Sequence, residues 1–137
     1  MANRVLDSWA LIAFFEDEPA ADAVEEIIDQ ANRDRHRLFL TAVNWAEVYY
    51  TTMREVSRAA AEAHALTIAN LPIDVIGIGD NLKLTRQAAI YKATYRISLA
   101  DAFAAALAKE KKAELVTGDR DFKLLENEIK ITWLKHS

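Results

Sequence analysis

The chain has 137 residues, of which 52% are hydrophobic, and this is enough for one compact domain with a sizeable core. Its formal net charge of −4 disfavours tight, sequence-independent binding of nucleic acid, which usually requires a basic surface that displaces phosphate counterions. If nucleic acid is bound, we expect the contact to be local and assisted by a metal ion.

Cysteine is absent, which excludes a disulfide framework, a thiolate metal site and a cysteine nucleophile. The first residues lack the pattern of a signal peptide, and no apolar run approaches the length of a membrane span. We therefore expect a cytoplasmic location without membrane contact. Three glycines and two prolines leave little room for linkers, and we predict a single domain over residues 1–137.

Short apolar runs alternate with helical patterns along the chain. We expect strands at residues 4–6, 38–40, 73–76, 114–116 and 129–133. We expect helices from residue 8, over 19–33, two between 43 and 70, and then over 80–96 and 99–112. This regular alternation predicts an α/β fold with a parallel or mostly parallel sheet that helices cover on both faces.

Four carboxylates stand where an expected strand gives way to a helix. They are Asp7, Glu47, Asp101 and Asp119. Because segments after the carboxyl ends of parallel strands gather at one edge of the sheet, we expect these acids to converge. A cluster this close cannot stay fully ionised without a cation, and hard oxygen ligands favour Mg²⁺ or Mn²⁺ over zinc.

Two of these acids also have a structural interpretation, helix capping. Glu47 follows Asn44, and Asp101 follows Ser98, by the three residues of a capping box. The two roles are compatible, because the positive end of a helix dipole favours an ionised carboxylate in the first turn. Asp121 favours an Asx turn and remains an additional candidate for the site.

No other recognised catalytic motif is present. Neither a GxxxxGK[ST] phosphate loop nor a GxGxxG dinucleotide fingerprint occurs. His36, His64 and His136 share no motif, and we interpret them as solvated surface residues. A metal-independent ribonuclease with a histidine acid and base is therefore disfavoured.

Two further groups of side chains have structural interpretations. The cations of one expected helix are spread around it, which favours a solvated face: Lys83, Arg86, Lys92 and Arg96. Large apolar residues in the earlier helices exceed what one layer against a sheet needs, which favours an interface: Trp9, Phe14, Phe15, Trp45, Tyr49 and Tyr50.

The four acid-bearing segments together resemble the PIN-domain nucleases, and within them the VapC-like toxins of toxin–antitoxin pairs. The matching segments are residues 5–8, 41–48, 97–108 and 116–122. Each motif alone is weak, whereas their order and spacing along the whole chain are fairly specific. The resemblance implies a three-layer α/β/α sandwich with a five-stranded sheet of order 3-2-1-4-5.

The same resemblance implies a Mg²⁺- or Mn²⁺-dependent endoribonuclease. By position, the catalytic and metal-binding roles fall on Asp7, Glu47, Asp101 and Asp119, with Ser8 and Thr117 as nearby hydroxyls. The implied partners are an RNA substrate, a cognate antitoxin protein and a second copy of the chain. Trp9 departs from the pattern, since many relatives have a small residue there, and this bears on the shape of the substrate channel.

Two other classes stay open at this point. One is another Mg²⁺-dependent phosphotransfer enzyme, such as a receiver or a haloacid-dehalogenase-like phosphatase. The phosphatase normally presents a second aspartate two residues after its nucleophile, where this chain has Trp9. The other is a non-catalytic interaction protein that keeps the PIN fold, which four intact acids disfavour.

Overall fold

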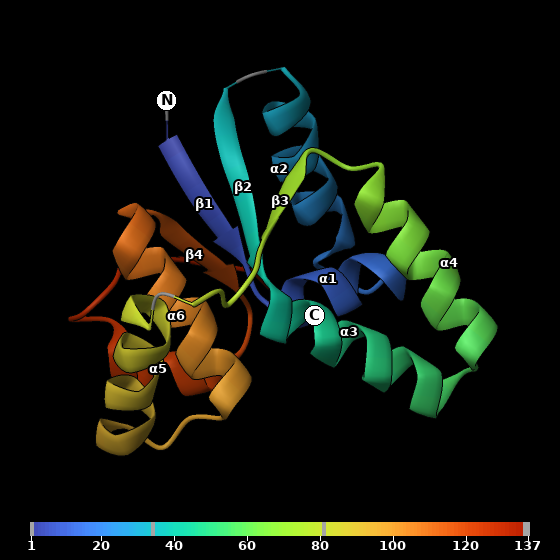
Figure 1. The fold of residues 1–137 in the computed structure, drawn as a ribbon. Helices are drawn as coiled ribbons and strands as arrows, with labels where there is room; N and C mark the ends of the chain where they lie inside the picture. The colour runs from blue at the N-terminus through green and yellow to red at the C-terminus, as the bar shows by residue number, and fades with distance from the viewer. Residues whose placement is uncertain (1, 34, 81, 136–137) are drawn as a thin grey trace.

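The computed structural model describes residues 2–33, 35–80 and 82–135. Their centre is a five-stranded sheet of order β3-β2-β1-β4-β5, in which all four strand pairings are parallel (Figure 1). The strands are β1 (Ala2–Leu6), β2 (His36–Thr41), β3 (Ile73–Ile76), β4 (Glu114–Thr117) and β5 (Ile131–Trp133). The predicted α/β class and strand order are confirmed.

Helices cover both faces of this sheet. They are α1 (Ser8–Phe15), α2 (Ala21–Asn32), α3 (Ala42–Glu55), α4 (Arg58–Ala69), α5 (Lys83–Thr94), α6 (Leu99–Lys111) and the 3-10 helix η1 (Arg120–Leu125). Side chains alternate between the faces along each strand, so Val5 belongs to one apolar cluster and Leu6 to another. Helices α1 and α2 cover the Leu6 side, and α5, α6 and η1 cover the Val5 side.

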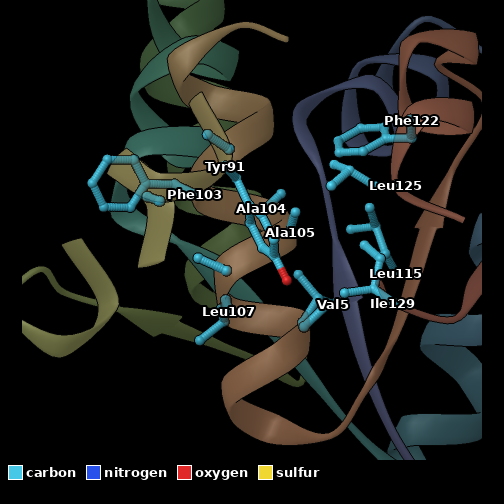
Figure 2. Close-up of a cluster of buried hydrophobic side chains, with 14 of the residues drawn as sticks. Val5, Tyr91, Phe103, Ala104, Ala105, Leu107, Leu115, Phe122, Leu125 and Ile129 are labelled. Atoms are coloured by element: carbon cyan, nitrogen blue, oxygen red, sulfur yellow. The ribbon is translucent and has the colours of Figure 1, made fainter. Parts of the chain in front are cut away.

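The α6 helix is the most deeply buried element. Its residues 100–108 are all buried, and six of these nine are alanines. Small side chains let the helix lie close to the sheet on one side and to α5 on the other, as Figure 2 shows for Tyr91, Ala104 and Val5. This packing fixes the first turn of α6, which carries Asp101, at the carboxyl edge of the sheet.

Some local expectations were wrong. The side chain of Thr41, not Asn44, caps α3 by accepting the N–H of Asn44 at 2.9 Å. The α2 helix begins at Ala21, two residues after Pro19, and η1 was not expected. Within the described residues, no helix is long and apolar enough to cross a lipid bilayer.

Candidate active site

The carboxyl edge of the sheet carries a cleft of about 300 Å³ that three of the four predicted acids line. These are Glu47 from α3, Asp101 from α6 and Asp119 from the segment after β4. Asp7, which follows β1, is only 1% exposed and does not line the cleft. Its charge nevertheless acts on Asp101, so all four acids belong to one electrostatic cluster.

Asp7 is held by hydrogen bonds from two directions. It caps α1 by accepting the N–H of Ala10 at 2.9 Å, and its other oxygen accepts the Thr117 hydroxyl at 2.5 Å. The Thr117 oxygen in turn accepts the N–H of Asp119 at 2.9 Å. Burial raises the pKa of Asp7 to about 7; these hydrogen bonds oppose that rise, and repulsion from Asp119 and Glu47 adds to it.

Asp101 stands in the first turn of α6, where the Ser98 side chain caps the helix by accepting the Asp101 N–H at 3.1 Å. Burial raises the pKa of Asp101 to about 8, with further repulsion from Asp119, Asp7 and Glu47. At neutral pH the cluster therefore retains protons unless a cation replaces them.

Asp101, Asp119 and Asp121 offer oxygens that all lie within 4.8 Å of one another. Two oxygens bound to one Mg²⁺ at about 2.1 Å are at most about 4.2 Å apart. A small movement of these side chains therefore brings the three oxygens within reach of one hard cation, and the donor set fits Mg²⁺ or Mn²⁺. The Asx turn predicted at Asp121 is made by Asp119, whose side chain accepts the Asp121 N–H at 3.0 Å.

Asn44 is a buried residue of the site that the sequence interpretation placed wrongly. Its side-chain N–H groups donate to Ser8 Oγ at 3.0 Å and to the carbonyl oxygen of Ala100 at 3.2 Å. Its side-chain oxygen, Oδ1, accepts the Thr41 hydroxyl at 2.5 Å. Asn44 thus connects β2, α1 and the first turn of α6, next to Asp101. In the sequence, the signal that Asn44 belongs to the site was its position one helical turn before Glu47.

His36 and His64 do not line the cleft. His36 is buried at the start of β2, where its Nε2 contacts the carbonyl oxygen of Ile27 at 2.9 Å, so its assignment to solvated surface was wrong. Burial, and then the charge of Arg4, lowers the pKa of His36. His64 is half-buried and stacks on Phe15. The prediction for His136 falls outside the described residues.

The wall of the cleft includes Trp9, whose ring lies directly against Gly118. A Cβ atom at Gly118 would stand 2.3–2.6 Å from three ring carbons of Trp9. A side chain at position 118 would force the Trp9 ring to move, so glycine is favoured at the turn that leads from β4 to Asp119.

Residues 4–128 match the family model of the PIN domain. No curated protein matches the chain.

Several solved structures have a similar fold. VapBC2 of Rickettsia felis, bound to a promoter DNA fragment, has a TM-score of 0.74 at 15% identity, covering 97% of this chain and 99% of that chain. VapBC-5 of Mycobacterium tuberculosis, a member of the VapBC family of toxin–antitoxin systems, has a TM-score of 0.63 at 20% identity. The match covers 98% of this chain and 99% of that chain. VapC20 of M. tuberculosis, a sarcin–ricin loop cleaving toxin, has a TM-score of 0.68 at 16% identity. The match covers 88% of this chain and 93% of that chain.

The Trp9–Gly118 contact predicts that Gly118→Ala destabilises the protein by about 1–3 kcal/mol, because the added methyl group overpacks the wall. Gly77→Ala is the matched control, since no atom lies within 4 Å of its added Cβ, and it should be neutral. Urea unfolding measures both. Adding Trp9→Val should recover part of the loss at Gly118, and equal stability of the two single variants would contradict the contact.

The acidic cluster predicts how the stability of the metal-free protein depends on pH. The pKa values of Asp7 and Asp101 are higher in the folded than in the unfolded chain, so the cluster costs nothing below about pH 4 and destabilises as the pH rises to 7–8. In chelator at pH 8, Asp101→Asn should therefore be more stable than the wild type by about 1–3 kcal/mol.

At pH 5 the stability gain of Asp101→Asn should be smaller than at pH 8. Thermal unfolding of the variant and the wild type at both pH values measures the difference. Asp22→Asn, which changes an exposed acid in the first turn of α2, is the control and should give no gain. A large loss of stability in Asp101→Asn would show instead that the carboxylate is structural.

Proposed function

The chain belongs to the PIN-domain family, and we propose that it is a divalent-cation-dependent endoribonuclease that acts in the cytoplasm as the toxin of a toxin–antitoxin pair. The observation that carries this proposal is the convergence of Asp7, Glu47, Asp101 and Asp119 at one edge of the sheet. The likeness of its fold to VapC20, a toxin that cleaves the sarcin–ricin loop, supports RNA as the substrate.

In this proposal Asp101, Asp119 and Asp121 would hold the cation, since their oxygens already lie within 4.8 Å of one another. When bound, the cation would lower the pKa of a water molecule and neutralise charge on the scissile phosphate. Asp7 supplies negative charge from beneath the cleft, where Thr117 and the start of α1 fix its orientation.

Glu47 takes a different role, because it stands on the rim of the cleft on another helix. It is half-buried, and its Oε2 accepts the hydroxyl of Tyr50 at 3.3 Å. From this position the carboxylate can accept a hydrogen bond from a water molecule in the cleft and orient it towards a phosphate. We propose Glu47 as the residue that positions the attacking water.

The two rival functions have less support. Receiver domains use a sheet of order 2-1-3-4-5, which differs from the order found here. The phosphatase alternative requires an acid two residues after Asp7, where Trp9 packs on Gly118 instead. A non-catalytic interaction protein with the PIN fold has no use for two buried carboxyls whose pKa values are raised by burial and by neighbouring acids, because their ionisation destabilises the fold.

Cleavage of RNA tests the proposal. The purified chain should cleave RNA in Mg²⁺ or Mn²⁺, lose this activity in chelator, and leave 5′-phosphate and 3′-hydroxyl ends. Glu47→Gln should lower kcat/KM by about 100-fold or more, because the water loses its orientation. Glu25→Gln on the exposed face of α2 is the matched control and should keep full activity.

Mass spectrometry of the products identifies the ends. His64→Gln should keep its activity, because His64 does not line the cleft. Products with a 2′,3′-cyclic phosphate, or cleavage that persists in chelator, would exclude the proposed chemistry.

We also propose that the chain forms a homodimer and binds an antitoxin protein. Exposed apolar side chains follow Glu47 along α3, where Tyr50 is 45% and Met53 47% exposed, and Val56, the residue after the helix, is 69% exposed. Spacings of three residues place Glu47, Tyr50 and Met53 on one side of the helix. This stripe leads from the cleft to the end of α3 and favours an interface. Of the aromatic residues predicted for an interface, it contains Tyr50, whereas Trp9, Phe14, Phe15 and Trp45 pack against the core.

Light scattering at micromolar concentration should report a dimer, and Met53→Glu should weaken it by about tenfold or more, because a charge is then buried in the interface. Ala23→Glu on the exposed face of α2 is the control and should leave the dimer unchanged. A wild-type protein that stays monomeric would contradict the dimer.

A further inference from the structure

Two adjoining hollows lie at the end of α6 that is remote from the acidic cleft. One, of about 400 Å³, lies between α5 and α6, and the other, of about 570 Å³, lies between the end of α6 and the amino-terminal edge of the sheet. Lys109 and Lys112 line both, so the two hollows adjoin at these side chains, and together they are called here the α5–α6 groove.

The α5–α6 groove is basic, although the chain as a whole has a net charge of −4. Its cations are Lys83, Arg86, Lys109, Lys111, Lys112 and Lys130, against the carboxylates Glu110, Glu114 and Glu128. Among the described residues, no carboxylate lies within ion-pair distance of Arg86, Lys109 or Lys112. The groove therefore holds positive charge that the protein itself does not neutralise.

The helix dipole accounts for the positions of only some of these cations. Lys109 and Lys111 stand in the last turn of α6, where the helix dipole favours positive charge. Lys83 and Arg86 stand in the first turn of α5, where the same dipole disfavours it. The first turn of α5 thus carries two cations that weaken the helix, and both line the groove. Both side chains are exposed, as the sequence predicted, and they face the groove.

Lys112 is also placed against local preference. It ends α6 in the left-handed region, with φ of 51° and ψ of 47°, a conformation that favours glycine. A lysine there adds a charge to both hollows at the cost of backbone strain. Residues that break local rules in this way tend to mark functional sites.

We propose that the α5–α6 groove binds the phosphates of single-stranded RNA a few nucleotides away from the bond that is cleaved. This inference rests on the proposed ribonuclease function. Asp101 and Lys109 are eight residues apart on α6, which corresponds to about 12 Å along the helix axis. The proposal requires that one RNA strand follow the protein surface from the cleft to the groove.

Charge favours RNA over other occupants of the groove. The acidic cleft repels a polyanion, so an RNA substrate needs attraction from another surface of the protein. A chain of phosphates matches a band of cations that spans two hollows. Ile90, which is 50% exposed in the same groove, offers bases an apolar contact.

The test is the binding of a fluorescent 12-nucleotide single-stranded RNA in chelator, measured by anisotropy at several salt concentrations. The double variant Arg86→Gln/Lys112→Gly should bind about tenfold more weakly, and its salt slope should be smaller by about 1.4, since each phosphate contact with a single strand contributes about 0.7. Glycine suits the backbone at position 112, so the variant should be at least as stable as the wild type, which thermal unfolding verifies.

Arg58→Gln is the matched control, because Arg58 begins α4, which lies on the other side of the molecule from α5 and α6 (Figure 1). It should bind RNA as the wild type does. Unchanged binding by the double variant, or an equal loss in the control, would overturn the inference. Binding of a poly-glutamate peptide as tight as that of the RNA, lost in the same variant, would also overturn it.

Binding in chelator needs no cleavage, so the two proposals can be separated. If the wild type cleaves RNA but the double variant binds it unchanged, only the groove assignment fails. If no RNA is cleaved in Mg²⁺ or Mn²⁺ but the groove variant still loses binding, the catalytic proposal fails and the groove remains an RNA-binding surface.

Discussion

The burial of carboxylates close to one another, where they also repel, is the constraint on which the rest of this structure depends. Asp7 and Asp101 are buried beside Asp119 and Glu47, and the pKa values of the first two rise accordingly. Such an arrangement is unfavourable for a metal-free protein, because each buried charge loses hydration and meets a like charge. A bound divalent cation would remove both costs, and stability and function would then depend on the same ion.

The fold holds the acids in place with parts that are themselves uncharged. The alanine-rich α6 lies close to the sheet and fixes Asp101, while Thr117 joins Asp7 to the backbone of Asp119. Asn44 connects the ends of β2, α1 and α6. These contacts oppose the separation that repulsion would otherwise cause, so the site is preorganised before any ligand arrives.

The sequence predicted the elements and the convergence of the acids, because the carboxyl ends of parallel strands always meet at one edge. It could not assign partners that depend on tertiary contacts. Asn44 fits a capping pattern equally well in isolation, and only the packing of α1 and α6 shows it to be buried. His36 is buried by residues distant in sequence, and the orientation of Asp121 depends on the unexpected η1 turn.

The central claim, that the acidic cluster binds a divalent cation, is tested most directly by anomalous diffraction from crystals soaked in Mn²⁺. We expect one ion between Asp101, Asp119 and Asp121, with carboxylate oxygens at about 2.0–2.6 Å, the range for hard cations. The anomalous peak of this ion should be absent from crystals of the Asp101→Asn variant. A wild-type crystal with no ion at this edge of the sheet, or with manganese bound only elsewhere, would contradict the account.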